Sequence, residues 1–311
     1  MRSALETGAG VNPSPAMINT RRGAVECATC GDGPAVLLLH GAMGGCDQGL
    51  LLGRAAIGCP GFQFVSVSRP GYLGTPLALG KTPEEQADLC ADVLESLGIS
   101  QAAVIAVSGG GQCALQFALR HQDRCWGLVM VSACSAQLNV RIPFTFQLLK
   151  LMARLPALAA VMRRKAVRDP ERAVQRSIPD PALRARTLTD PEAGPMLIAL
   201  QLSTFDQLAR RLPGAENDIA QSRLPFDYPI ERITAPVLVV HGKADHLVPY
   251  AQAQSLAARL RGAEFLTIEG GEHVSLFTHL RDIRERVTQF LNAHAPSARQ
   301  SASTVDRRGG S

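Results

Sequence analysis

The sequence of 311 residues has few aromatic side chains and no dense block of positive charge. It contains one Trp and three Tyr, and Lys plus Arg (32) exceed Asp plus Glu (27) by five. Aromatic side chains that stack on bases and a concentrated basic surface are the usual marks of nucleic-acid binding. Their scarcity argues against nucleic acid as a partner, although the mild basic excess still permits nonspecific contact with anionic surfaces.

A long uninterrupted apolar run is also missing. The most apolar long segment, residues 144–162, is broken by Lys150, Arg154 and Pro156, which does not suit a membrane-spanning helix. Residues 1–16 contain no apolar stretch of the kind that a secretory signal has. We therefore expect a cytoplasmic protein without stable membrane insertion.

The cysteines do not form the pattern of a metal site. Cys27 and Cys30 make one C-x-x-C pair, but no second pair stands at the spacing that a zinc site needs. Four other cysteines fall in segments predicted to be buried, where free cysteine behaves as a small apolar side chain: Cys90, Cys113, Cys125 and Cys134. We expect no metal and no other cofactor.

What is present is an alternation of short apolar runs with helical patterns. Most of the runs are apolar throughout, which is typical of parallel strands covered on both faces. Thr82-Pro83-Glu84-Glu85 is a capping box that predicts a helix ending near Gly98. The alternation predicts an α/β fold with a mostly parallel sheet flanked by helices. The predicted strands are 35–40, 62–68, 103–107, 128–131, 237–241 and 264–268.

One region interrupts this alternation. Residues 135–232 contain no convincing strand, much helical periodicity, frequent proline and many arginines. We interpret them as a helical cap over the carboxyl edge of the sheet, with its basic residues on solvated faces. The core then comprises residues 21–134 and 233–294. Residues 1–20 and 295–311 are rich in small and polar residues, and we expect them to be disordered tails.

The most informative segment is Ala106-Val107-Ser108-Gly109-Gly110, between an apolar strand and a helix. A small residue, any residue, Ser, any residue and Gly form the pattern of the nucleophile elbow. We expect the tight turn to need small side chains two positions either side of Ser108. It lifts the hydroxyl clear of the sheet at a helix N-terminus, which favours developing negative charge. A Gly-rich turn that binds a phosphate is the alternative interpretation.

Three other segments complete a catalytic constellation. The loop after the strand at 35–39 can point the N–H of Ala42, or failing that of Met43, toward Ser108, while Gly109 supplies a second oxyanion donor. Asp245 follows one strand, and His273 lies on a Gly-bearing loop after the next. A histidine placed so can act as a general base held by a carboxylate.

Other residues are weaker candidates for this chemistry. Cys113 is a rival nucleophile near the elbow, although it already lies inside the predicted helix. We expect His246 to be a surface or supporting residue and His40 to shape the loop that follows it. His241 has no evident partner in the sequence, and we expect it to be ordinary.

With these landmarks, residues 21–293 resemble the α/β-hydrolase fold superfamily, as a serine hydrolase with a helical cap. The segment Arg69-Pro70-Gly71-Tyr72-Leu73-Gly74-Thr75 resembles the family's Pro-Gly-x-Gly loop. Ser68 departs from the pattern because the family commonly has Asp there. The resemblance implies that the cap is inserted after the strand that follows the nucleophile helix, which fits residues 135–232.

A serine at the elbow, where some enzymes of this fold carry a carboxylate, favours acyl chemistry. We expect a carboxylic ester hydrolase that works through an acyl-enzyme with Ser108, His273 and Asp245. The candidate pocket residues are apolar and indicate a small hydrophobic ester or acyl substrate: Met43, Phe144, Phe146 and Val248.

Several alternatives stay open. The same three residues serve a carbon–carbon bond hydrolase, a lactonase, an aminopeptidase, an acyltransferase or a haloperoxidase-like side activity, and a ligand-binding receptor can retain the fold. Residues 148–165 combine apolar and basic side chains, so transient contact with an anionic membrane is a further hypothesis. The sequence does not predict the oligomeric state.

Overall fold

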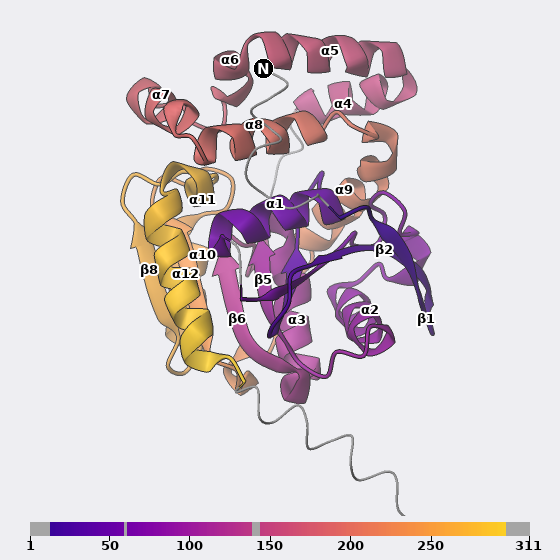
Figure 1. Cartoon of the computed structure of the whole chain (residues 1–311), viewed down its shortest axis with the longest axis vertical. Coiled ribbons are helices and arrows are strands. Elements are labelled where there is room, and N and C mark those ends of the chain that lie inside the picture. The colour runs from indigo at the N-terminus through magenta and orange to yellow at the C-terminus, as the bar shows by residue number, and fades with distance from the viewer. Residues whose placement is uncertain (1–12, 59–60, 139–143, 297–311) are drawn as a thin grey trace, which may run out of the picture.

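The computed structural model describes residues 13–58, 61–138 and 144–296, and within them an eight-stranded sheet forms the centre of the molecule (Figure 1). The strand order is β1-β2-β4-β3-β5-β6-β7-β8, and all neighbours from β4 to β8 pair in parallel. The mostly parallel α/β sheet is therefore confirmed. The strands are β1 (Ala16–Thr20), β2 (Gly23–Cys30), β3 (Ala35–Leu39), β4 (Gln63–Val67), β5 (Ala102–Val107), β6 (Cys125–Val131), β7 (Val237–Gly242) and β8 (Glu264–Ile268).

The N-terminal edge of the sheet differs from the prediction. Residues 16–20 were expected to belong to a disordered tail, but they form β1, which pairs antiparallel with β2. Most side chains of this edge strand are exposed or half-buried. An edge strand held by backbone pairing carries no apolar signal in its sequence, which is why the prediction was wrong there. The predicted tail residues 1–12 and 297–311 lie outside the described residues.

Two apolar cores cover the two faces of the sheet. In β3, Leu37 and Leu39 pack into the core beneath α2, α3 and α10, while Val36 and Leu38 pack into the core beneath α1 and α12. This double burial explains why the strand is apolar throughout. The capping box at Thr82 is present. The helices of this part are α1 (Cys46–Ile57), α2 (Pro83–Ser96), α3 (Gly111–Arg120), α10 (Tyr250–Arg259), α11 (Ser275–Thr278) and α12 (Leu280–His294), with 3-10 turns η1 (Leu77–Leu79), η2 (Ser108–Gly110) and η3 (Gln122–Arg124).

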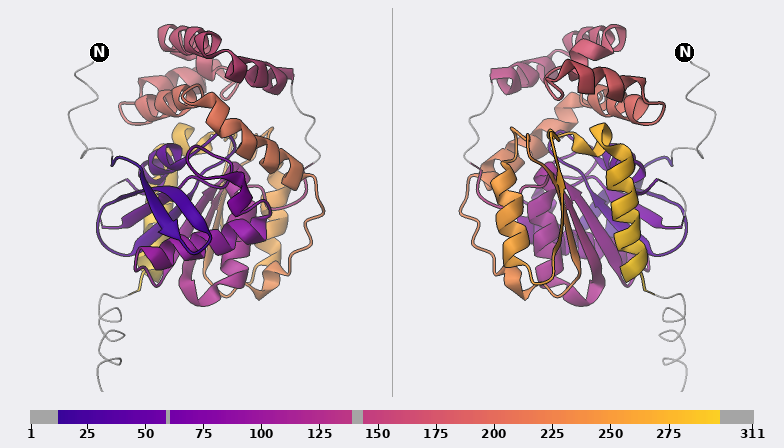
Figure 2. Two further views of the ribbon diagram at one scale, coloured as in Figure 1. Left: turned by 90° about the vertical axis from the view of Figure 1, so that its right-hand side faces the viewer. Right: turned by 90° about the vertical axis from the view of Figure 1, so that its left-hand side faces the viewer.

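Between β6 and β7 the described residues form helices and their connections without a strand, and the short turn η4 (Ile230–Arg232) follows them. The helices lie over one end of the sheet, with α5 farthest from it (Figures 1 and 2). Proline at the first position starts several of them, and Asp169 and Asp180 cap two. They are α4 (Phe144–Arg154), α5 (Pro156–Arg168), α6 (Pro170–Val174), α7 (Pro181–Thr189), α8 (Ala193–Ser203) and α9 (Leu208–Ser222). Nowhere in the described ranges is a helix long and apolar enough to cross a membrane.

Candidate active site

Ser108 lies on a sharp turn between β5 and α3, with φ of +51°. A Cβ on Gly110 would lie 2.7 Å from the carbonyl oxygen of Leu39, and a Cβ on Gly41 would lie 2.9 Å from the Cβ of Ser108. Position 110 therefore requires a small residue, as predicted. The atoms that a Cβ there would meet belong to Leu39 and His40, at the end of β3, and not to residue 106. Holding a serine at positive φ costs energy that the surrounding packing must offset.

The structure brings together the three residues that the sequence singled out as a catalytic set. His273 Nε2 lies 3.0 Å from Ser108 Oγ, and His273 Nδ1 lies 2.9 Å from Asp245 Oδ2. A carboxylate only accepts hydrogen bonds, so Nδ1 carries the proton and Nε2 is free to accept one from the Ser108 hydroxyl. The arrangement can transfer a proton from serine to histidine without moving any heavy atom far.

Asp245 is held as a carboxylate by its surroundings. Its Oδ1 accepts hydrogen bonds from the backbone N–H groups of Leu247 and Val248, each at 2.9 Å. Burial by itself would raise the pKa of Asp245, but hydrogen bonds from His241 and His273 outweigh it, and the pKa is lowered well below its ordinary value. Asp245 therefore stays ionised wherever the protein is folded near neutral pH.

His241 is a partner that the sequence did not reveal. It is buried at the end of β7, with Nε2 2.9 Å from the Val248 carbonyl oxygen and 3.3 Å from Asp245 Oδ2. Both neighbours are acceptors, so Nε2 carries a proton, and His241 contacts the same carboxylate oxygen as His273. The expectation of an ordinary residue was wrong. The one available signal was its position four residues before Asp245.

The loop after β3 is shaped by His40, as expected. His40 Nε2 accepts a hydrogen bond from the Arg69 backbone N–H at 3.0 Å, so Nδ1 donates to the Gly41 carbonyl oxygen at 2.7 Å. Burial, reinforced by the charge of Arg69, lowers the pKa of His40 well below its ordinary value, and the ring is neutral. The Ala42 nitrogen lies 3.3 Å from where a Cβ on Gly109 would be, so the two expected oxyanion donors are neighbours.

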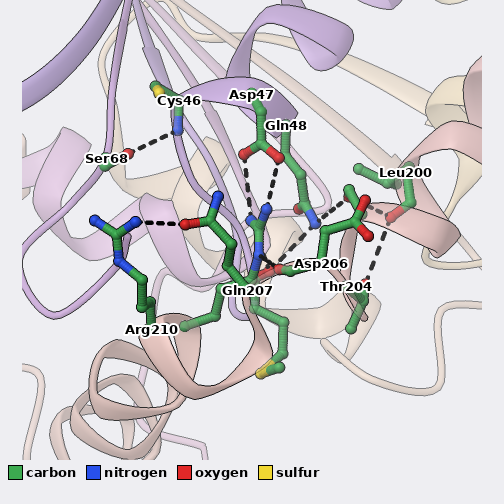
Figure 3. A network of polar contacts seen from close by, with 12 residues as sticks. Cys46, Asp47, Gln48, Ser68, Leu200, Thr204, Asp206, Gln207 and Arg210 are labelled. Carbon is green, nitrogen blue, oxygen red and sulfur yellow. Dashed lines mark hydrogen bonds and ion pairs between the residues drawn. The ribbon is translucent and has the colours of Figure 1, made fainter. Parts of the chain in front are cut away.

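The cap anchors the same loop. Met43 has φ of +61°, and its carbonyl oxygen accepts from Gln48 Nε2 at 3.2 Å and from Arg211 Nη1 at 3.4 Å. Arg211 comes from α9, and it also pairs with Asp47 at 2.6 Å. Figure 3 shows Asp47 and Gln48 among the cap residues of this network. Arg211 is 1% exposed, so the expectation that the basic residues of the cap lie on solvated faces was wrong for it.

A second buried ion pair joins α9 to the core beside the nucleophile turn. Arg69 donates to both carboxylate oxygens of Asp218, at 2.9 and 2.5 Å, and the Tyr72 hydroxyl donates to Asp218 Oδ2 at 2.6 Å. Burial would lower the pKa of Arg69, but Asp218 outweighs it and the pKa is raised. Burial and the charge of Asp218 raise the pKa of Tyr72, so the phenol keeps the proton that it donates.

Ser68 stands where the family commonly has Asp, and the carboxylate of this loop comes from another residue. Its hydroxyl accepts from the Cys46 N–H at 3.0 Å and donates to Glu26 Oε2 at 2.8 Å. The same Glu26 oxygen accepts from the Gly74 N–H at 3.0 Å. The carboxylate for this loop is therefore supplied by β2, from a part of the sequence that the motif does not include.

The candidate pocket residues fall into different groups. Met43 and Phe146 belong to one apolar cluster under the cap, together with Tyr72. Val248 packs instead in a small cluster with Cys134 and Leu138. The side chain of Phe144 lies outside the described part of the chain.

The remaining candidates do not join the site as reacting groups. Cys113 is buried inside α3, and the His246 side chain is 77% exposed. Cys27 is buried in β2, and this burial raises its pKa to about 12, so its thiol is a poor metal ligand or nucleophile at neutral pH. Across residues 13–58, 61–138 and 144–296, no group of His, Cys, Asp and Glu side chains is arranged to hold a metal ion.

A mostly parallel sheet with Ser108, Asp245 and His273 beyond the ends of its strands is the architecture of the α/β-hydrolase class. A family model for the alpha/beta hydrolase fold matches residues 34–280. The chain belongs to the α/β-hydrolase fold family and is a hydrolase of that fold.

Three similar proteins illustrate the range of this family. An alpha/beta hydrolase fold protein from Nakamurella multipartita has 32% sequence identity and a TM-score of 0.76, over 90% of this chain and 99% of that one. A 2-hydroxy-6-oxononadienedioate/2-hydroxy-6-oxononatrienedioate hydrolase from Burkholderia vietnamiensis is 24% identical over 267 residues, which are 83% of this chain and 86% of the relative. A thermophilic esterase from Thermogutta terrifontis shares the fold, with a TM-score of 0.64 and 20% identity over 91% of this chain and 100% of that one.

Proposed function

We propose that the protein is a serine hydrolase that cleaves carboxylic esters of small, hydrophobic acids through an acyl-enzyme. The observation that carries this proposal is the continuous hydrogen-bond chain from Ser108 through His273 to Asp245. A serine hydroxyl is a weak nucleophile by itself, and an adjacent base that is oriented by a carboxylate is what activates it.

In the first half of the reaction, Ser108 Oγ attacks the ester carbonyl carbon while His273 Nε2 takes its proton. The carbonyl oxygen becomes an oxyanion, which the N–H groups of Ala42 and Gly109 stabilise. His273 then protonates the leaving alcohol oxygen as the carbon–oxygen bond breaks, which leaves the acyl group on Ser108. Asp245 stabilises the imidazolium in both steps.

In the second half, a water molecule attacks the acyl carbon and gives its proton to His273. The oxyanion forms again in the same place and collapses to the free acid, and the proton returns to Ser108 Oγ. No cofactor takes part in these steps. Each oxyanion donor typically contributes about 2.7–4 kcal/mol to transition-state stabilisation.

The cluster under the cap supports a hydrophobic acyl group. Met43, next to the proposed oxyanion donor, packs with Phe146, Leu208 and other apolar side chains of the cap. Apolar side chains around a few polar groups are the usual composition of a small-molecule site. We therefore infer that the acyl chain of the substrate enters this cluster.

Carbon–carbon bond hydrolysis is the second candidate function, because the Burkholderia vietnamiensis relative is named for a substrate of that kind. The same serine, histidine and aspartate serve both reactions. A substrate comparison separates the two candidates: ester hydrolysis predicts turnover of simple alkyl esters, whereas the alternative predicts turnover of a 2-hydroxy-6-oxo-dienoate and little of the esters.

The proposal is tested with a series of p-nitrophenyl acyl esters, assayed with the wild type, Ser108→Ala and Cys113→Ala. We expect turnover by the wild type and by Cys113→Ala, and a loss on the order of 10⁶-fold in kcat for Ser108→Ala. A fluorophosphonate probe should label Ser108, as read by peptide mass spectrometry. Equal activity of Ser108→Ala and the wild type would refute the proposal.

A further inference from the structure

We propose that Asp218, on cap helix α9, determines specificity by excluding substrates whose acyl group carries a carboxylate near the scissile carbonyl. This inference rests on the proposed function, since it concerns the acyl site of the same reaction. Its basis is the place of the Arg69–Asp218 pair, which no part of the proposed mechanism uses.

The pair lies directly beside the proposed oxyanion hole. A Cβ on Gly109 would lie 3.0 Å from Asp218 Oδ2, 3.3 Å from the Ala42 nitrogen and 3.6 Å from Arg69 Nη2. The carboxylate and guanidinium therefore occupy the space that a side chain of residue 109 would fill. Glycine at 109 leaves room for a charged pair next to the residue whose N–H is a proposed oxyanion donor.

The two side chains of the pair differ in their exposure to solvent. The Asp218 side chain is 11% exposed, whereas the Arg69 side chain is 1% exposed. Arg69 also donates hydrogen bonds to the His40 carbonyl oxygen at 3.0 Å and to Gln86 Oε1 at 3.2 Å. From a Cβ on Gly109, Asp218 Oδ2 at 3.0 Å is also nearer than Arg69 Nη2 at 3.6 Å, so we infer that a ligand in the site meets the carboxylate first.

The buried arginine of α9 is not free to offset this negative charge. Arg211, which reaches the Met43 carbonyl oxygen, is already paired with Asp47 at 2.6 Å. An acyl carboxylate would therefore approach Asp218 Oδ2, the carboxylate oxygen beside Gly109, while both nearby guanidinium groups are already bound to carboxylates. Two carboxylates that approach each other in a poorly solvated site repel strongly, because the low local dielectric constant weakens the screening of their charges.

The test compares two ethyl esters of matched shape, ethyl 4-methylpentanoate and ethyl hydrogen succinate, by pH-stat titration at pH 7.5. The first is neutral and the second carries a carboxylate in place of the terminal isopropyl group. We expect the wild type to have a kcat/KM at least tenfold higher for the neutral ester. In Asp218→Asn this preference should fall by at least tenfold, because Arg69 loses its counter-charge and becomes a partner for the anionic acyl group.

Glu216→Gln is the matched control. Glu216 lies on the same helix, pairs with Lys150 at 2.6 Å and is 45% exposed, so removing its charge should leave the preference within twofold of the wild type. A general loss of stability in Asp218→Asn would lower both rates and leave their ratio unchanged, which is why the ratio is the readout.

Each outcome bears on the inference. Wild-type rates that are equal for the two esters contradict charge exclusion and leave the proposed function standing, whatever the variant does. An unchanged preference in folded Asp218→Asn assigns the exclusion to another group and overturns the role of Asp218. No wild-type turnover of either ester contradicts the proposed function and this inference together.

Discussion

At the scale of single residues, the candidate site depends on a few side chains whose state is set by their neighbours. Asp245 is kept ionised by hydrogen bonds that outweigh its burial, and His40 is kept neutral by burial and the charge of Arg69. The first group can stabilise a positive charge on His273, while the second can only organise a loop. The surroundings of each side chain therefore fix its charge and with it its role in the site.

The lowered pKa of Asp245 makes a prediction about stability. A carboxyl group whose pKa is lower in the folded than in the unfolded chain contributes stability that is fully present above its ordinary value of 3.8. That contribution is lost as the pH falls from there toward the folded pKa. We expect the difference in unfolding free energy between the wild type and Asp245→Asn to be constant from pH 6 to pH 8 and to shrink below about pH 4.

Chemical denaturation at a series of pH values measures that difference. His246→Gln, beside Asp245 but largely exposed, serves as the control and should show no such dependence below pH 4. A difference between the wild type and Asp245→Asn that grows on acidification would mean that Asp245 is not stabilised as the anion.

Arg211 gives a second prediction, on catalysis. Removing its guanidinium leaves the Met43 carbonyl oxygen with the hydrogen bond from Gln48 alone and frees the Asp47 carboxylate, so the loop that holds Ala42 loses its direct bond to α9. We expect Arg211→Met to lower kcat about tenfold or more with little change in KM, because the oxyanion is stabilised mainly in the transition state. Steady-state kinetics on one p-nitrophenyl ester measure both constants.

Arg210→Met is the control for that change. Arg210 is the preceding residue of α9, but it is exposed and donates to Leu73 and Gln207 rather than to the loop. We expect its kcat to stay within twofold of the wild type. An equal loss in both variants would point to a general disturbance of α9 and not to the anchor.

At the scale of elements, α9 joins the cap to the core loops that surround the candidate site. It carries both Asp218 and Arg211, and these two ion pairs have opposite polarity, since the arginine comes from the core in one and from the cap in the other. Between them, Gly214 lies against the Tyr72 ring, and the Gly214 N–H donates to the Gly71 carbonyl oxygen at 2.9 Å.

The close approach at Gly214 makes a third prediction. A Cβ there would lie 2.3 Å from two carbon atoms of the Tyr72 ring, so Gly214→Ala must displace either the ring or the helix. Alanine favours helix by about 1 kcal/mol over glycine, but the overlap is expected to outweigh this gain. We expect a net loss of about 1–3 kcal/mol in unfolding free energy, together with a lower kcat.

Denaturant unfolding and ester hydrolysis measure the two effects of Gly214→Ala. Ala220→Ser, at an exposed position on the same helix, is the control and should change stability by less than about 0.5 kcal/mol. A stabilised Gly214→Ala variant would show that helix propensity, and not contact with Tyr72, governs this position.

At the scale of the whole molecule, exposed apolar side chains concentrate at one end. Eight large apolar side chains are exposed among the described residues, and five of them lie on or between α4 and α5: Leu148, Leu151, Leu155, Val161 and Val167. The same two helices carry Lys150, Arg154, Arg163, Arg164, Lys165 and Arg168. Of the two, α5 lies farther from the sheet (Figure 1).

This surface makes a fourth prediction. Apolar side chains among basic ones favour peripheral contact with an anionic bilayer, strengthened at low salt. We expect the protein to co-sediment with vesicles that contain phosphatidylglycerol, and to do so less at 0.5 M NaCl or in Leu151→Ser/Leu155→Ser. Leu224→Ser, which changes an exposed residue after α9, is the control. Absence of binding at low salt contradicts the prediction, and a dimer in sedimentation velocity would assign the surface to self-association.

The amino-acid sequence by itself determined the parallel part of the sheet and the three residues that we propose for catalysis. Strands such as 35–39 are buried on both faces and must be apolar throughout, and the turn at Ser108 must carry glycine at position 110, so both leave a signal that is local in sequence. The weakly buried β1 leaves no such signal and was missed. Asp245 and His273 each follow a strand within a few residues, so a parallel sheet brings them to the same edge as Ser108.

Only the tertiary structure decided what surrounds that set. Glu26 replaces the missing carboxylate beside Ser68, His241 supports Asp245, and Asp218 and Arg211 connect the cap to the loops of the site. Each of these contacts joins side chains from different elements, and most join residues far apart in the chain. A cap arginine looks the same in the sequence whether it faces water or a carboxylate of the core. The difference is set by packing between elements, which no local pattern encodes.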